Sequence, residues 1–158
     1  PGFRIGWIAG DKDIIRKYVL VKQGTDLQCN TIAQMTIAEY LKRYDIDKHI
    51  AKIVEVYRKR RNVAIESIDR SFPDTIKFTR PEGGLFTWIE LPVGISAREV
   101  LVRSLEKKIA FVPGGSFYPN GNKENTLRIN YSNMPEDKIE KGLKTLGEVV
   151  KEYIRQSE

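Results

Sequence analysis

The sequence predicts a chain of mixed α/β class, made of a fragment of an α/β layer, a long helix and a small α+β domain. Three observations lead to this prediction. An apolar run at residues 3–9 is followed by two helical patterns within the first 44 residues. No proline or glycine occurs from 45 to 72, where apolar residues recur at helical spacing. After Pro73, short strand-like runs alternate with two more helical patterns, as in a small antiparallel sheet covered by two helices.

The first 44 residues are expected to hold one buried strand and two helices. The apolar run from Phe3 to Ala9 is typical of a strand. Asp11 should begin the first helix, because its carboxylate can accept a hydrogen bond from a free backbone N–H of the first turn. That helix should end at about Lys22, and Asn30 or Thr31 should begin the second one.

A helix is expected over 45–70, and Pro73 should end it. A helix of this length usually bridges two packing environments, because it exceeds the width of a small domain. Ser96 and Glu99 have the spacing of a capping box and should begin a later helix, and Pro135 should begin the last one, where its missing N–H costs nothing. Four short strands are expected around these helices, over 76–78, 85–91, 109–112 and 127–131.

The composition is that of an ordinary globular protein, with 41% hydrophobic and 30% charged residues among 158. The net charge of +6 is spread among acidic neighbours, which favours a solvated helix face over a nucleic-acid surface. We expect no membrane span and no signal peptide, because no apolar run has the required length or flanks. Since the first residue is not methionine, Pro1 is expected to be an internal residue of a longer polypeptide.

Several kinds of reactive site are excluded by the residues themselves. Cysteine and histidine occur once each, as Cys29 and His49, so neither a metal cluster nor a Ser–His–Asp arrangement is expected. They fall in different predicted elements, which argues against a cysteine nucleophile. A single cysteine fits a reducing cytoplasm. The sequence also lacks the glycine-rich patterns of phosphate loops and dinucleotide sites.

Two arginines in apolar strands remain as candidates for ligand binding. Arg4 is flanked by apolar residues and by glycines, which permit close approach of a ligand, and its guanidinium can fork onto an oxyanion. Arg128 alternates with Leu127 and Ile129 and should point to the opposite face of its strand. Each arginine also has an ordinary interpretation: Arg4 as an edge-strand residue with its head in water, and Arg128 as part of a polar outer face.

Together these segments resemble the class I/II aminotransferases, which belong to the fold-type-I family of enzymes that use pyridoxal 5'-phosphate (PLP). Residues 1–7, PGFRIGW, match the end of the family pattern S-K-x-x-x-P-G-x-R-x-G-[WY]. Three later runs match family patterns in the same order: PEGGLFTW at 81–88, VPGGSF at 112–117 and LRINYS at 127–132. The pair at 34–35, Gln-Met, and the PEGGLF variant look most like the branch that acts on 2-aminoadipate, kynurenine and related amino acids.

The resemblance implies the C-terminal part of such an enzyme. Residues 1–44 would be the remnant of the large PLP-binding domain, 45–70 the interdomain helix and 71–158 the small C-terminal domain. It further implies a homodimer that transfers an amino group between an amino acid and a 2-oxo acid, and the single cysteine favours the cytoplasm as its location. No metal, nucleic acid or membrane partner is expected.

The resemblance also assigns roles to the two arginines. Arg4 matches the residue that binds the PLP phosphate, and Arg128 matches the residue that clamps the α-carboxylate of the substrate. The Schiff-base lysine of the family pattern would fall upstream of Pro1, so we expect no catalytic residue in this chain and no activity from the chain alone.

One alternative shares the same patterns. Some transcription regulators use this fold as an effector domain fused to a DNA-binding module. We favour the enzyme, because both arginines are retained and no DNA-binding module is visible in the sequence. The sequence upstream of Pro1 would decide between the two.

Overall fold

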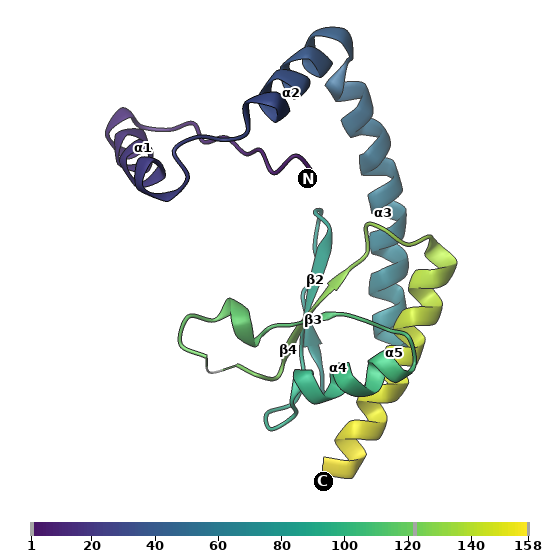
Figure 1. Cartoon of the computed structure of the whole chain (residues 1–158). Coiled ribbons are helices and arrows are strands. Elements are labelled where there is room, and N and C mark those ends of the chain that lie inside the picture. The colour runs from purple at the N-terminus through teal and green to yellow at the C-terminus, as the bar shows by residue number, and fades with distance from the viewer. Residues whose placement is uncertain (1, 122, 158) are drawn as a thin grey trace. The chain divides into compact units, whose positions relative to one another are not determined.

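The computed structural model describes residues 2–121 and 123–157, and these form two compact units (Figure 1). The first unit extends to Ala51, and the second extends from Lys52 onward. Helix α3, Ile46–Ser71, begins in the first unit and continues in the second. The long helix expected from the sequence is therefore confirmed, and Pro73 follows its end.

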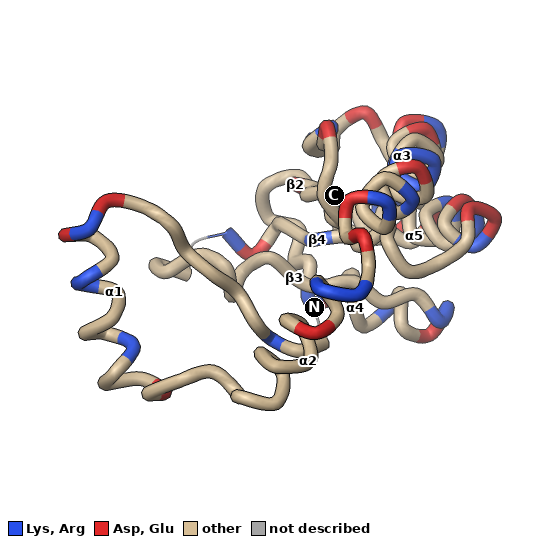
Figure 2. The backbone as a smooth tube through the Cα atoms, turned by 90° about the horizontal axis from the view of Figure 1, so that it is seen from above, with Lys and Arg blue, Asp and Glu red and all other residues tan. Residues whose placement is uncertain are grey.

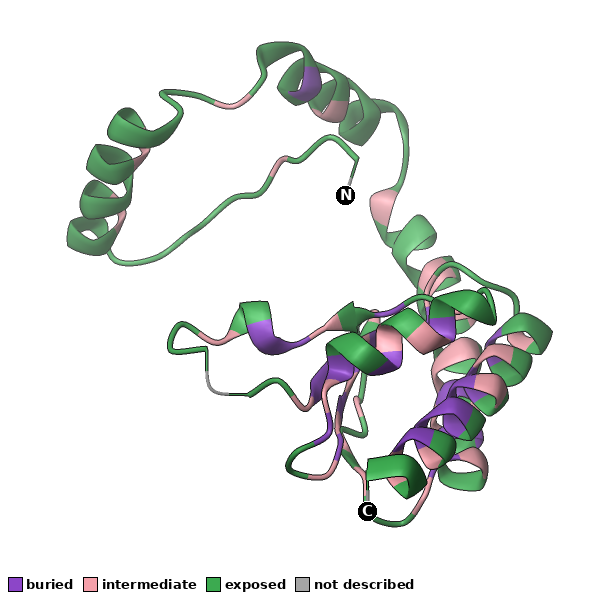
Figure 3. Cartoon of the chain, turned by 60° about the horizontal axis from the view of Figure 1, so that its bottom comes forward, coloured by how far each residue is buried: buried purple, intermediate pink, exposed green. Residues whose placement is uncertain are grey.

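The first unit contains helices α1, Lys12–Thr25, and α2, Thr31–Arg43. The side chains of Asp11 and Asn30 each accept a hydrogen bond of 2.9 Å from a backbone N–H of the first turn, which confirms both predicted helix starts. Ala33 is the one buried residue of these two helices, and Figure 3 shows the unit almost wholly exposed.

The strand predicted for Phe3 to Ala9 is wrong. Residues 4–10 have no regular secondary structure, and Arg4 adopts a left-handed backbone with a φ of 55°. Trp7 is 86% exposed. The physical reason is that a strand needs a neighbour to pair its N–H and C=O groups, and the described part of this unit contains no strand. An apolar pattern indicates a tendency to burial, and it supplies no pairing partner.

The second unit contains a four-stranded antiparallel sheet with the order β1-β2-β4-β3. The strands begin and end as follows: β1 Lys77–Phe78, β2 Phe86–Glu90, β3 Val112–Pro113 and β4 Thr126–Asn130. A strand is present at each of the four expected places, but the third, Val112–Pro113, shares only Val112 with the predicted 109–112. The first residues of the predicted strand do not pair with β4. The N–H of Ile109 instead donates to the carbonyl of Ser104, near the end of the preceding helix, at 2.9 Å.

Helices α4, Ala97–Glu106, and α5, Glu136–Ser157, pack on this sheet together with the last turns of α3. The sequence led us to expect two covering helices, whereas Ala64 and Ile68 of α3, each 1% exposed, also belong to the core. One face of the sheet contributes to the core, through Ile89, Leu127 and Ile129.

Only one of the two hydrogen bonds of the predicted capping box of α4 is present among the described residues. The Ser96 hydroxyl accepts from the N–H of Glu99 at 3.4 Å, but the Glu99 carboxylate accepts a hydrogen bond from the Tyr153 hydroxyl of α5. Glu99 therefore ties two helices together, because a tertiary partner replaces the local one.

Charged residues of both signs lie along α3 and α5, as Figure 2 shows, which agrees with the expected solvated faces. Among the helices that the structure describes, none is both long and apolar enough to cross a membrane.

Candidate functional site

The candidate site lies on the face of the sheet opposite to the core. The register of β2 and β4 places Trp88 directly opposite Arg128, and Arg128 is also the partner of Val112 on β3. Leu127 and Ile129, which flank Arg128 on β4, are buried in the core. The structure therefore places Arg128 on the face that the alternation in the sequence predicts.

Aromatic rings surround the guanidinium of Arg128. Its Cζ lies 4.2 Å from the centre of the Phe86 ring and 4.8 Å from that of Phe117. Trp88 contacts the rings of Phe117 and Tyr118 edge-on, with centroids 5.6 and 6.1 Å apart. Phe86 and Phe117 are 41% and 49% exposed, so the cluster opens to the surface.

Arg128 has a buried donor without a partner. Its Nε is shielded from solvent and makes no hydrogen bond with any described residue. The terminal nitrogens of the same guanidinium also make no hydrogen bond with the described residues, so they can donate to an oxyanion. The Nε of Arg60 is shielded without a partner in the same way, so what distinguishes Arg128 is the pair of rings at its guanidinium.

Gly114 explains how Phe117 reaches Arg128. The 3-10 turn η1, Gly115–Phe117, follows β3, and the N–H of Gly114 donates to the carbonyl of Thr126 at 2.6 Å. A β-carbon on Gly114 would stand 2.1 Å from the Thr126 hydroxyl and 2.7 Å from the Trp88 ring. Only glycine therefore permits this close passage over β4.

Sequence reasoning did not identify the roles of Phe86, Phe117 and Gly114, although all three lie in the runs PEGGLFTW and VPGGSF. The available signal was that each of these runs places an aromatic residue beside a glycine pair. Their convergence on Arg128 depends on strand pairing, which the sequence does not display.

A second hollow lies beside the PEGG turn, within the second unit. The hydroxyl of Tyr131 donates to the carbonyl of Gly83 at 3.0 Å, and Arg61 of α3 donates to the carbonyl of Glu82 at 2.6 Å. Burial raises the pKa of Tyr131, and the nearby Arg61 offsets part of that rise. The adjoining cavity has a volume of about 310 Å³ and reaches Tyr57 of α3.

Arg4, the other candidate, belongs to the first unit and is exposed. No side-chain hydrogen bond or ion pair joins it to another residue within the described ranges. Its left-handed φ of 55° is unusual for a residue with a side chain. Contrary to the prediction, it does not lie in a strand.

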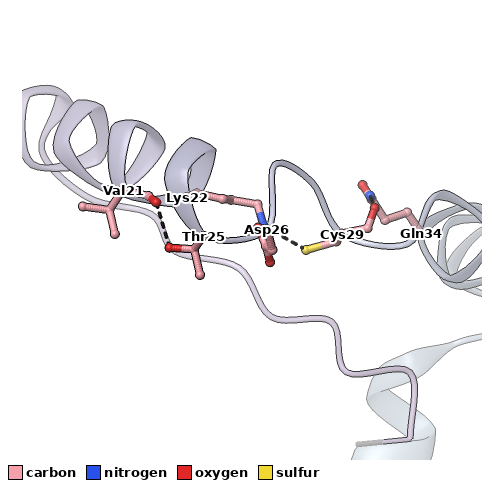
Figure 4. A network of polar contacts seen from close by, with 6 residues as sticks. All are labelled: Val21, Lys22, Thr25, Asp26, Cys29 and Gln34. Atoms are coloured by element: carbon pink, nitrogen blue, oxygen red, sulfur yellow. Dashed lines mark hydrogen bonds and ion pairs between the residues drawn. The ribbon is translucent and has the colours of Figure 1, made fainter.

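A polar network joins the end of α1 to the start of α2 (Figure 4). Lys22 Nζ donates to the Asp26 carboxylate at 2.6 Å and lies 3.5 Å from Cys29 Sγ. The hydrogen bond to Asp26 raises the pKa of Lys22. The side chain of Gln34 donates to the carbonyl of Cys29 at 3.0 Å. Cys29 thus contacts Lys22 through its sulfur and Gln34 through its backbone carbonyl. No group of three potential metal ligands occurs among the described residues.

Known aminotransferases match nearly the whole chain. The kynurenine aminotransferase of Pyrococcus horikoshii is 43% identical, with a TM-score of 0.83 over 96% of this chain and 38% of its own. LysN, the α-aminoadipate aminotransferase of Thermus thermophilus, was solved with N-(5'-phosphopyridoxyl)-L-leucine. It is 36% identical, with a TM-score of 0.87 over 99% of this chain and 40% of its own.

A curated relative, aromatic-amino-acid aminotransferase 1 of Thermococcus litoralis, is 42% identical over 98% of this chain and 37% of its own length. The chain thus spans well under half of the relatives it matches. Transcription regulators of the HTH type also match, at a lower identity of 25–29%. The family model described as aminotransferase class I and II matches residues 1–146. The fold, the ordered sequence runs and this match together show that the chain belongs to the class I and II aminotransferase family.

Proposed function

We propose that this chain is the C-terminal part of a PLP-dependent aminotransferase that transfers an amino group between an amino acid and a 2-oxo acid. The observation that carries the proposal is the guanidinium of Arg128, which lies over two aromatic rings and makes no hydrogen bond or ion pair with the described residues. A planar cation of this kind suits bidentate binding of a carboxylate, which amino acids and 2-oxo acids share.

Arg128 would anchor the α-carboxylate, and this anchoring would also set the direction of the Cα–H bond. Holding a reacting bond in one orientation lowers the entropic part of the barrier. The rings of Phe86 and Phe117 would exclude water from the arginine, which strengthens its attraction for an anion. The chain's own contribution is therefore to bind and orient the substrate.

The residues present fit a cofactor that carries a phosphate group. Arg4 is exposed, its donors are not engaged by the described residues, and its strained backbone is a feature that clusters at ligand sites. Arg4 would hold the PLP phosphate through charge-assisted hydrogen bonds. When bound, PLP supplies an electron sink for the amino-transfer chemistry.

We assign residues 1–44 to the large PLP-binding domain, 45–70 to the interdomain helix and 71–158 to the small domain. The expected limit between the large domain and the helix, at 44–45, lies near Ala51, where the first compact unit ends. The last turns of the helix pack into the core of the second unit. The 158 residues alone are expected to be inactive, because the family's Schiff-base lysine has no counterpart among them.

We propose a homodimer in the cytoplasm, with amino acids and 2-oxo acids as partners and no nucleic acid. Large apolar side chains of the first unit support an association surface there, since they are exposed: Trp7, Ile8, Leu20, Val21 and Ile32. The single free cysteine, Cys29, agrees with a reducing compartment.

The experiment that tests the proposal uses the complete polypeptide that contains these residues, supplied with PLP. We expect it to convert amino acids such as 2-aminoadipate or kynurenine when a 2-oxo acid is supplied as the acceptor, and the 158-residue chain to be inactive under the same conditions. An effector domain of a transcription regulator is the alternative, because HTH-type regulators are among the relatives. A complete polypeptide that binds DNA and transfers no amino group would establish that alternative.

A further inference from the structure

We infer that Phe86 and Phe117 are positioning residues, which hold the guanidinium of Arg128 in the orientation that receives a carboxylate. This inference rests on the proposed function, because it concerns how the same arginine is held. It adds two residues that would act on substrate recognition through Arg128.

The two rings reach Arg128 from different elements. Phe86 comes from β2, and Phe117 comes from the turn after β3. Both ring centres lie within 5 Å of the guanidinium carbon, at 4.2 and 4.8 Å. At such separations the negative face of an aromatic ring attracts a cation. Two attractions from separate elements restrict the guanidinium more than one would.

Arg80 is an arginine whose guanidinium is oriented by a carboxylate, and it provides a comparison for Arg128. Its guanidinium also lies over a ring, that of Phe78, at 4.7 Å. However, both of its terminal nitrogens donate to the Asp69 carboxylate, at 3.0 and 2.5 Å, so its fork is already occupied. Arg128 makes no ion pair with the described residues. Aromatic rings orient a guanidinium without using its donors, which leaves the fork of Arg128 available to a substrate.

The ring of Phe117 is itself held in place. Trp88 contacts it edge-on with centroids 5.6 Å apart, and Trp88 is the ladder partner of Arg128. Gly114 lets the turn pass against Trp88, since a β-carbon there would lie 2.7 Å from that ring. The geometry therefore links the turn, both rings and the arginine as one packed group.

The test uses the complete enzyme and measures the ratio of kcat/KM for an α-amino acid to kcat/KM for its decarboxylated amine. Phe117 is replaced by phenylalanines with one, two and three ring fluorines, which weaken the negative face of the ring and change its shape little. We expect the ratio to fall with each fluorine, by about 3- to 30-fold in total, because kcat/KM for the acid falls more than kcat/KM for the amine, which has no carboxylate for the guanidinium to bind. The same series at Phe86 should act in the same direction.

Phe78 provides the matched control, because it pairs with an arginine at a similar distance but packs against the core. Fluorination there should leave the ratio unchanged. Arg128→Ala distinguishes a failure of the proposed function from a failure of this inference. If Arg128→Ala keeps the full preference for the acid, the proposed function and this inference both fail. If Arg128→Ala loses the preference while the fluorinated Phe86 and Phe117 enzymes keep it, the rings serve packing alone and only this inference is overturned.

Discussion

Gly147 of α5 lies against the backbone carbonyl of Ser71, the last residue of α3, so closely that a β-carbon at Gly147 would stand 2.4 Å from that oxygen. Real β-carbons do not occupy such positions, so the two helices approach each other only because residue 147 is glycine. This contact joins the end of the long helix to the helix that supplies much of the core.

Gly147→Ala should therefore destabilise the second unit, although alanine favours a helix. Overpacking a close contact costs about 1–3 kcal/mol in the free energy of unfolding, which exceeds the helix propensity gained. The free energy is measured by urea denaturation. Gly142→Ala in the same helix is the control, because its β-carbon would meet Ile109 at an ordinary 3.6 Å. That variant should gain about 0.5–1 kcal/mol. Equal effects of the two substitutions would refute the contact.

Arg128→Lys should impair the complete enzyme even though the charge is kept. Lysine lacks the planar fork, so the α-carboxylate loses an oriented pair of hydrogen bonds. We expect kcat/KM for the amino acid to fall roughly tenfold to a few hundredfold, from a loss of ~1.5–3 kcal/mol. Both kcat and KM should change, because a misplaced carboxylate also misplaces the Cα–H bond.

In Arg128→Ala, the preference for the amino acid over its decarboxylated amine should largely disappear. Steady-state kinetics with both compounds provide the measurement. Retention of the full preference would mean that another group recognises the carboxylate.

Arg4→Ala should weaken PLP binding by the complete enzyme by ~1.5–3 kcal/mol, the value of a hydrogen bond to a charged group. The dissociation constant is measured by titrating the apoenzyme with PLP. Arg16→Ala is the matched control, because Arg16 is an exposed arginine of the same unit on α1. It should leave PLP affinity unchanged, and equal losses in the two variants would argue against a specific phosphate contact.

Tyr153 should make the free energy of unfolding decrease with pH in the alkaline range. The hydrogen bond to Glu99, together with burial, raises the pKa of Tyr153 above its ordinary value near 10. The neutral phenol is thus favoured in the folded state. Its contribution to stability is fully present below pH about 10 and is lost as the pH rises through the folded pKa.

The stability difference between wild type and Tyr153→Phe should accordingly be constant from about pH 7 to about 10 and shrink above it. Phenylalanine keeps the ring on which Arg103 lies, at 4.4 Å. Denaturation curves at a series of pH values give the difference. Glu99→Gln, which keeps an acceptor and removes the charge, should reduce the pH dependence. A difference that stays constant above about pH 10 would exclude the coupling.

Helix starts were predicted well because their causes are local, whereas α1 continues past the predicted end at about Lys22 to Thr25. Asp11 and Asn30 accept from N–H groups of their own first turns, and the long helix lacks any breaker between its ends. The strand expected at 3–9 failed because strand formation depends on a distant partner. The third strand was placed too early for a similar reason, since Ile109 bonds the end of α4 in place of β4.

The sequence by itself determined the mixed α/β class, the order of the elements after residue 10, the family and the face on which Arg128 lies. These follow from periodicity, from capping and from ordered runs of residues, all of which are local in the chain. Only the tertiary structure decided that Phe86 and Phe117 meet at Arg128, that Glu99 bonds Tyr153, and that Gly147 meets Ser71. The reason is that such contacts depend on strand register, loop path and helix approach, which arise when separate segments pack together.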